Sequence, residues 1–234
     1  SALAAPLRPD ADLGAHGLVS VEAGAVDRHA ALEADSLRLI AQAPVPVPDA
    51  PDARLVSFRA EGSGLEHLAV VVGRPDAAEA PLVRIHSECF TGDLMGSMRC
   101  DCGEQFRGAI ARIAEAGDGV VLYLAQEGRG IGLANKLRAY ALQDRGLDTL
   151  DANRALGWGA DERSFDVGSA MLSLLGVRRI RLLTNNPDKV AGIARRGIEV
   201  AGREEHKFDP NGVNDDYLRT KAARFGHMLD GETA

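Results

Sequence analysis

The 234-residue sequence predicts an α/β (α+β) fold, in which helices pack on a mixed sheet within a single main domain. Three observations favour this fold. Short runs rich in branched apolar residues, separated by glycine and proline, recur from residue 54 onward. In the second half, such runs alternate with helical segments that end at glycine. A continuous apolar run at 119–124 is typical of a strand buried on both faces, and this alternation builds a sheet covered by helices.

Residues 1–50 are rich in alanine, aspartate and proline, and we expect them to form an N-terminal extension before a main domain at 51–234. Within the extension, residues 30–43 are expected to form a short helix. The run at 44–51, PVPVPDAP, is typical of an extended, Pro-rich linker. Because this part carries no motif of a functional site, we expect it to be dispensable for chemistry.

The main domain is expected to begin with three strands, followed by a cysteine-containing segment, a helix, a further strand and a glycine-rich turn. The predicted strands are 54–59, 67–73, 81–86, 119–124, 179–183 and 198–201. The predicted helices are 103–117, 133–145, 166–175, 188–196 and 215–229.

All three cysteines lie in one short segment, with ten residues between Cys89 and Cys100 and one residue between Cys100 and Cys102. An odd number of cysteines argues against a closed disulfide framework. Three thiolates suit a zinc ion whose fourth tetrahedral position is left for water. The alternative is three small buried apolar side chains, which the charged neighbours make less favoured. His86 is a possible fourth ligand, but on a strand its side chain would point away from Cys89.

The glycine-rich turn at 126–132, QEGRGIG, joins a predicted strand to a predicted helix. Its backbone amides can converge on an anion at the helix N-terminus, and Arg129 can add a forked donor for phosphate. The turn matches neither the dinucleotide fingerprint nor the P-loop pattern, so an ordinary turn is the alternative. The following helix is expected to present a solvated face with one aromatic anchor, made of Lys136, Arg138 and Tyr140.

Two further polar loops are candidates for a phosphate or catalytic site. Asp161 and Arg163 lie in a loop before a predicted helix, and from the residues alone this loop is a charged turn. Thr184 and Lys189 flank a strand-to-helix loop, where a hydroxyl, backbone amides and an ammonium group suit a phosphate. An ordinary capping loop is equally compatible with the second pattern.

The composition and net charge limit the kinds of protein that this chain could be. The chain is 45% hydrophobic and 26% charged, which is ordinary for a soluble globular enzyme. A net charge of −7 makes a general nucleic-acid-binding surface unexpected. Apolar runs are shorter than the ~18 residues that a membrane span requires. The N-terminus lacks the apolar core of a signal peptide, and thiolate ligands fit a reducing compartment, so we expect a cytoplasmic protein.

The cysteine segment at 84–105 closely resembles the zinc-binding signature of GTP cyclohydrolase II, an enzyme of riboflavin biosynthesis. The segments 126–133, 161–163 and 182–187 match the same family in the same order, and the resemblance runs to about residue 229. The run at 203–210 departs from the family pattern because it is more acidic. The resemblance implies one Zn²⁺ per chain, Mg²⁺ with the triphosphate, GTP as substrate and a homodimer.

The reaction implied by the resemblance is hydrolysis of GTP. Water activated by zinc attacks C8 of guanine and opens the imidazole ring with release of formate, and a separate cleavage between the α- and β-phosphates releases pyrophosphate. The implied product is 2,5-diamino-6-ribosylamino-4(3H)-pyrimidinone 5′-phosphate, in the first step of riboflavin biosynthesis. Two alternatives stay open: a homologue with a formylated or secondary-metabolite product, and a non-catalytic nucleotide- or zinc-binding protein.

The resemblance also assigns roles to individual residues. It makes Cys89, Cys100 and Cys102 the metal ligands. It makes Asp161 a proton acceptor, Arg163 the nucleophile at the α-phosphorus, and Tyr140 a neighbour of the metal-bound water. A guanidinium stays protonated, with a pKa above ~12, so stabilisation of transition-state charge is the physically conservative role for this arginine. The GTP contacts that the resemblance implies are Arg84, Ile85, His86, Ser87, Glu88, Gln105, Glu127, Gly128, Arg129, Thr149, Thr184 and Lys189.

Overall fold

The structure of the protein is a computed structural model, which describes residues 17, 20–21, 24, 29–159 and 161–215. The helix expected at 215–229 lies outside these residues, except for its first position. Most of the expected N-terminal extension before residue 29 also lies outside them. No helix in the described part of the chain has both the length and the apolar character needed to cross a membrane.

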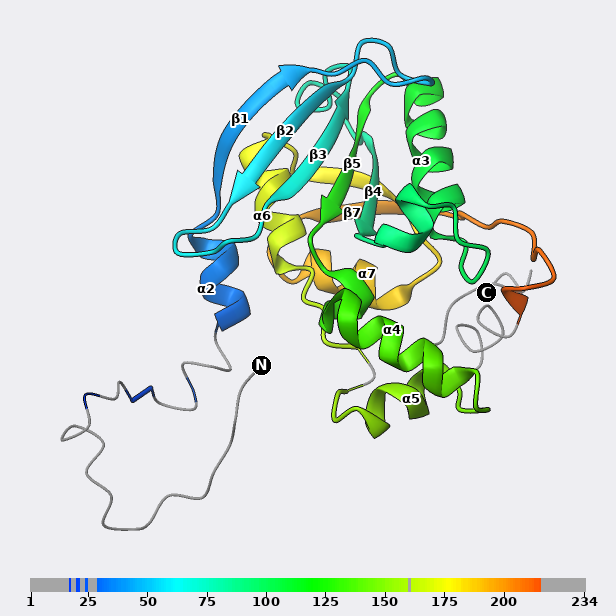
Figure 1. Cartoon of the computed structure of the whole chain (residues 1–234). Coiled ribbons are helices and arrows are strands. Elements are labelled where there is room, and N and C mark those ends of the chain that lie inside the picture. Colours follow the sequence, from blue (N-terminus) through cyan, green and yellow to red (C-terminus); the bar gives the residue numbers. More distant parts are fainter. Residues whose placement is uncertain (1–16, 18–19, 22–23, 25–28, 160, 216–234) are drawn as a thin grey trace.

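A seven-stranded mixed sheet forms the centre of the protein, with strand order β1-β2-β3-β5-β4-β6-β7 (Figure 1). Strands β1, β2, β3 and β5 pair antiparallel, whereas β5, β4, β6 and β7 pair parallel. The strands are β1 (Arg38–Pro44), β2 (Arg54–Arg59), β3 (His67–Val72), β4 (Leu82–Ser87), β5 (Gly119–Leu124), β6 (Arg179–Leu183) and β7 (Glu199–Glu204). The predicted α/β fold with a mixed sheet is therefore confirmed.

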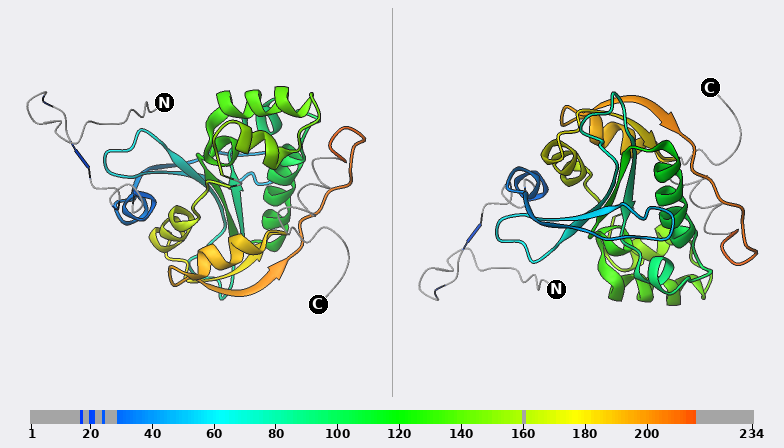
Figure 2. Two further views of the ribbon diagram at one scale, coloured as in Figure 1. Left: turned by 90° about the horizontal axis from the view of Figure 1, so that it is seen from below. Right: turned by 90° about the horizontal axis from the view of Figure 1, so that it is seen from above.

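Helices cover both faces of the sheet (Figure 2). The long helix α3 packs on one face, and α2, α6 and α7 pack on the other. Helices α4 and α5 lie beyond the ends of β4 and β5 (Figure 1). The helices are α2 (His29–Asp35), α3 (Cys102–Ala116), α4 (Gly132–Gln143), α5 (Thr149–Ala155), α6 (Asp166–Leu174) and α7 (Pro187–Ala194), with shorter turns η2 (Phe90–Leu94) and η3 (Glu127–Gly130).

The position of β5 inside the sheet explains why the sequence of this strand is continuously apolar. Val120 and Leu122 pack in the core with α2, α6 and α7, whereas Val121, between them, packs in the core with α3. All three side chains are almost completely buried, and burial of each stabilises the fold by about 1.5–3 kcal/mol. A central strand with helices on both faces has no polar face, so it carries no alternation in sequence.

The N-terminal part of the fold differs from the expectation. The helix expected at 30–43 ends at Asp35, and β1 (Arg38–Pro44) follows it and pairs antiparallel with β2. The expected linker at 44–51 is a tight connection between β1 and β2, closed by a bridge between Val47 and Ala50. All side chains of β1 are exposed, so this edge strand has no alternating pattern to reveal it. The sheet therefore begins before residue 51.

Candidate active site

One pocket lies at the carboxyl ends of the parallel strands β4, β5 and β6. The segments that follow these strands contribute Glu88, Glu127 and Thr184 to its wall, and α3, α4 and α5 close it from other sides. The carboxyl edge of parallel strands is the usual ligand site of α/β proteins, because loops from neighbouring strands meet there. The sheet thus brings together segments that are far apart in the sequence.

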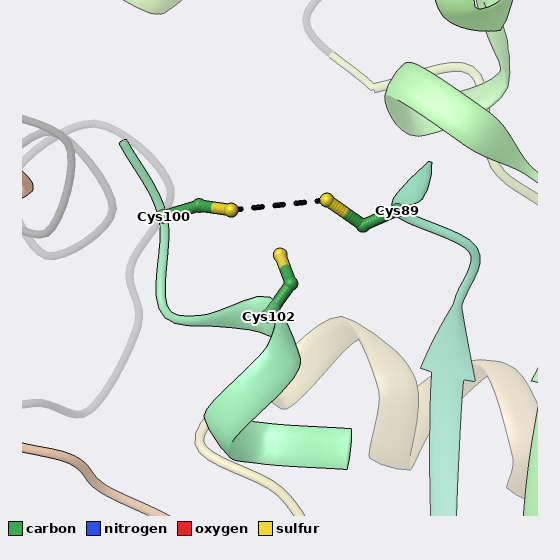
Figure 3. A group of neighbouring side chains, drawn as sticks. All are labelled: Cys89, Cys100 and Cys102. Carbon is green, nitrogen blue, oxygen red and sulfur yellow. Dashed lines mark hydrogen bonds between the residues drawn. The ribbon is translucent and has the colours of Figure 1, made fainter. Parts of the chain in front are cut away.

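Three thiols gather at one side of this pocket. Cys89 follows β4, whereas Cys100 precedes α3 and Cys102 is its first residue (Figure 3). The three sulfur atoms point toward one another and all lie within 4.8 Å of one another, with 3.7 Å between Cys89 and Cys100. The cysteines carry no disulfide. This group could hold a metal ion, as expected from the sequence.

Gly92 keeps the space beside the thiols open. A Cβ atom at this position would lie 2.8 Å from Sγ of Cys100 and 3.0 Å from Sγ of Cys89. It would also lie 2.9 Å from Cβ of Cys102. Any larger residue would therefore push the three thiols apart, so the glycine is part of how the chain forms this group.

The thiol of Cys89 has a pKa well below its ordinary value. The main causes are hydrogen bonds from Cys100 and Cys102, and the nearby ammonium of Lys136 adds to them, so that burial is outweighed. Lys136 Nζ lies 3.0 Å from this sulfur. The prediction of a solvated helix face is wrong for Lys136, because its side chain is only 11% exposed.

His86 does not belong to the thiol group. Its Nε2 lies 3.0 Å and 3.1 Å from the two carboxylate oxygens of Asp93, and its ring stacks on Tyr123. Asp93 also accepts hydrogen bonds from the Cys89 amide and the Tyr123 hydroxyl, each at 2.9 Å. The histidine therefore acts through Asp93, which fixes the backbone of the first cysteine.

Two buried cations lie on the floor of the pocket. Arg84 is 5% exposed and donates to the Leu183 carbonyl at 2.8 Å and to Oε1 of Gln105 at 2.6 Å. Burial lowers the pKa of Arg84 to about 10, so the guanidinium stays charged at neutral pH. Lys189 donates to the Ile85 carbonyl at 2.7 Å. Buried positive charge of this kind favours an anionic ligand.

The loop after β6 is fixed by its own side chains. Thr184 accepts a hydrogen bond from the Asn186 amide at 3.0 Å, and Asn186 in turn caps α7. The side chain of Asn185 pairs with both backbone groups of His206, at 2.7 Å and 3.0 Å. His206 then contacts the Gln105 carbonyl through Nε2 at 2.7 Å. The acidic run at 203–210 is therefore attached to the wall of the pocket through His206.

Arg163 reaches the pocket from the loop before α6. It forms a two-pronged ion pair with Asp161 and also donates to the Ser87 hydroxyl at 3.3 Å. Burial alone would raise the pKa of Asp161, but hydrogen bonds from Arg163 and its charge hold it below the ordinary value. The adjacent Glu162 amide donates to the Arg129 carbonyl at 3.2 Å. This loop therefore lies against the glycine-rich turn.

Tyr140 lies on α4, beneath two cations. The guanidinium of Arg99 is 4.7 Å from the centre of its ring, and the ammonium of Lys136 is 5.9 Å from it. Burial is the main reason why the pKa of Tyr140 lies above its ordinary value. Its hydroxyl therefore carries its proton at neutral pH.

Comparison with known proteins decides the family. The family model described as GTP cyclohydrolase II matches residues 38–205. The chain belongs to the GTP cyclohydrolase II family. It is 54% identical over 214 residues to a GTP cyclohydrolase-2 of Azospirillum brasilense, covering 92% of this chain and 56% of that protein. It is 50% identical over 195 residues to a GTP cyclohydrolase-2 of Cronobacter sakazakii, covering 83% of this chain and 98% of that protein.

A third relative is the riboflavin biosynthesis protein RibBA of Parabacteroides distasonis. It is 50% identical over 176 residues, which cover 75% of this chain and 44% of that protein. The chain thus spans about half the length of the first and third relatives, and nearly all of the second.

The structure places most residues that the GTP cyclohydrolase II resemblance singled out around this pocket. Ile85 and Asp161 are the exceptions among them. The Ile85 side chain points into the core on the opposite face of the sheet, and only its carbonyl contacts Lys189. Asp161 acts on the pocket through Arg163.

Sequence reasoning missed several polar residues of this GTP cyclohydrolase II pocket and its support, and Lys136, Asp93, Asn185 and His206 are examples. Lys136 lies four positions before Tyr140, so the two share one face of α4, and this spacing could have revealed it. Asp93 lies inside the cysteine segment, but it also accepts from Tyr123, 30 residues away, and no local pattern predicts that contact. Asn185 and His206 face each other across 21 residues, and no local pattern predicts that pairing.

Proposed function

We propose that the protein is a zinc-dependent GTP cyclohydrolase II. It hydrolyses GTP to formate, pyrophosphate and 2,5-diamino-6-ribosylamino-4(3H)-pyrimidinone 5′-phosphate, the first step of riboflavin biosynthesis. The observation that carries the proposal is that one pocket holds three clustered thiols together with buried cations. Such a pocket suits a substrate whose base and triphosphate need different chemistry. Membership of the family supports the same reaction.

Cys89, Cys100 and Cys102 would hold Zn²⁺. Tetrahedral zinc with Zn–S bonds of ~2.3 Å separates its sulfur ligands by about 3.8 Å, and the 3.7 Å between Cys89 and Cys100 fits this value. When bound, zinc would supply a Lewis acid that activates water for attack at C8 of guanine. The protonated hydroxyl of Tyr140 would move a proton during ring opening, which is the role of a general acid–base group.

The triphosphate would lie against the cationic side of the pocket. The buried ammonium of Lys189 offers positive charge to phosphate oxygens. Arg163 would stabilise negative charge at the α-phosphorus, and its ion pair with Asp161 supports this role over that of nucleophile because it keeps the guanidinium charged. Mg²⁺ would accompany the triphosphate, as phosphoryl transfer commonly requires.

The remaining GTP contacts follow from the resemblance. Glu127, Gly128 and Arg129 would bind the nucleotide from the glycine-rich turn, which lines the pocket. Ser87 and Gln105 would contribute from β4 and α3. Thr149, at the start of α5, would contribute from the opposite wall, where its hydroxyl accepts from Gln143 at 3.4 Å.

The proposal also covers the oligomeric state, the cellular compartment and the partners of the enzyme. We expect a homodimer in the cytoplasm, acting on GTP without a nucleic-acid or membrane partner. The net charge of −7 supports the absence of a nucleic-acid partner. Light scattering of the purified chain would test the dimer, and a monomer at assay concentrations would contradict it.

Product analysis tests the proposed reaction. The purified full chain would be loaded with Zn²⁺ and Mg²⁺ and incubated with GTP, with ATP as the control nucleotide. We expect equal amounts of formate and pyrophosphate from GTP and neither product from ATP. Pyrophosphate without formate would instead identify a homologue that stops at the formylated intermediate. GTP binding without turnover would identify a binding protein.

A further inference from the structure

Lys136 connects two parts of the pocket that no sequence motif joins. From the middle of α4, its ammonium lies 3.0 Å from Sγ of Cys89 and 2.9 Å from Oε1 of Glu127. The side chains of Lys136 and Glu127 are only 11% and 10% exposed. Both contacts are therefore shielded from water, where a charge-assisted hydrogen bond is stronger than at the surface.

Glu127 continues this connection to the backbone beside the first cysteine. Its Oε2 accepts from the Phe90 amide at 2.6 Å, and its Oε1 also accepts from the Gly128 amide at 2.7 Å. Phe90 directly follows Cys89. Lys136 and Glu127 together thus contact the cysteine centre at two points, the sulfur of Cys89 and the amide after it.

The turn held by Glu127 has a costly backbone conformation. Gly128 has φ 64°, and Arg129, which is not a glycine, has φ 63°. A non-glycine residue in this left-handed region costs about 1–3 kcal/mol and persists only where its surroundings hold it. The contacts of Glu127 are one such restraint, so loss of Lys136 would loosen the turn as well as the sulfur.

We infer that Lys136 is a positioning residue that couples the cysteine centre to the substrate turn Glu127–Gly130. This inference rests on the proposed function. Three thiolates and Zn²⁺ carry a net charge of −1, and a donor to one sulfur withdraws electron density from it. Partners of metal ligands commonly tune the metal in this way. The ammonium of Lys136 also contacts the Glu127 carboxylate, which shapes the substrate turn. The metal site and the nucleotide site therefore share Lys136 as a common partner.

The spectrum of Co²⁺-loaded protein tests the contact to sulfur without any turnover. Removal of the cationic donor makes the Cys89 thiolate a better electron donor, so the sulfur-to-cobalt charge-transfer band should move to longer wavelength in the neutral variants Lys136→Met and Lys136→Gln. Lys136→Arg, which keeps a cationic donor, should stay near the wild-type band. Arg138→Met is the matched control, because Arg138 is exposed on the same helix and contacts Asn135. An unshifted band in both neutral variants would overturn the inference.

A double-mutant cycle tests the coupling to the substrate turn. Binding of the α,β-methylene analogue of GTP would be measured for wild type, Lys136→Met, Glu127→Gln and the double variant. If the two residues act through one contact, the losses are non-additive: we expect about fivefold weaker binding in each single variant and little further loss in the double. Losses that multiply in the double variant would contradict the coupling.

The results that would contradict the proposed function differ from those that would contradict the role of Lys136. Wild-type protein that neither binds Co²⁺ through sulfur nor releases formate from GTP would contradict the function itself. A wild-type protein that does both, with an unshifted band in both neutral Lys136 variants, would contradict only the role of Lys136.

Discussion

Arg163 binds Asp161 through two parallel hydrogen bonds, with Nε 2.8 Å from Oδ1 and Nη2 2.5 Å from Oδ2. The side chain of Arg163 is 12% exposed, and its third nitrogen reaches Ser87 at the pocket wall. A guanidinium held in this fork is fixed in position and stays protonated. The relationship therefore favours an electrostatic role for Arg163 at the substrate phosphates.

Replacement of Arg163 by alanine should slow pyrophosphate release by about 10²–10³-fold, the usual effect of losing one group that stabilises developing charge. Arg163→Lys should recover part of the rate, because a positive charge suffices for stabilisation. Arg154→Ala, an exposed position on α5, is the control. Product release would be followed by a coupled pyrophosphate assay, and an unchanged rate in Arg163→Ala would remove this residue from the reaction.

Tyr140→Phe should lower the rate of formate release by about 10²-fold, because general acid–base groups typically contribute 10²–10⁴-fold. The ring should keep its packing beneath Arg99, so the affinity for GTP should change little. Formate release and equilibrium binding of GTP would be measured side by side. Equal loss of affinity and rate would show that Tyr140 serves binding instead of proton transfer.

Gly92→Ala should lower the zinc content of the purified protein from one ion per chain to a small fraction of that value. The added methyl group would lie 2.8 Å from Sγ of Cys100, a distance that real Cβ atoms essentially never show, and 3.0 Å from Sγ of Cys89. Gly64→Ala is the control, because a Cβ there meets nothing within 4 Å. Metal analysis of both variants checks this expectation, and full zinc occupancy in Gly92→Ala would contradict the proposed site.

Stability should fall as the pH is lowered below 6.5, partly because of His206. Burial, with the nearby charge of Arg84, lowers its pKa from 6.5 to about 4. Between these two values the unfolded chain binds a proton that the folded chain does not, so acid favours unfolding. Urea unfolding at pH 7.0 and 5.0 should show a smaller pH-dependent loss in His206→Gln than in wild type. An equal loss in both proteins would mean that His206 titrates normally in the fold.

The sequence alone was enough to predict those helices and strands whose residues show a local pattern. Strand β5 is continuously apolar, and α3 ends at Ala116 with Gly117 as its C-cap, so both were predicted within a residue or two. Strand β1 was predicted as a helix because its residues are exposed on both faces and its stability comes from backbone pairing with β2. That pairing depends on tertiary structure and leaves no periodic signal.

The same distinction applies to the site. The three cysteines share one short segment, so their spacing alone indicated a metal centre. Lys136 is 47 residues away from Cys89 in the chain, and only the fold brings its ammonium to that sulfur. The family resemblance singled out Asp161 and Arg163, but their ion pair follows from geometry that the sequence does not contain.

Formate release by a zinc-free variant tests the central claim most directly. Cys100→Ser protein, shown to be folded by circular dichroism, would be assayed for bound zinc, formate and pyrophosphate in the presence of GTP and Mg²⁺. Attack at C8 needs a nucleophile that is strong at neutral pH, whereas cleavage at the α-phosphorus needs positioning and positive charge, which lie outside the thiol group. We predict that zinc and formate release are lost almost entirely and that measurable pyrophosphate release persists. Formate release at the wild-type rate from the zinc-free protein would contradict the claim and make the metal structural.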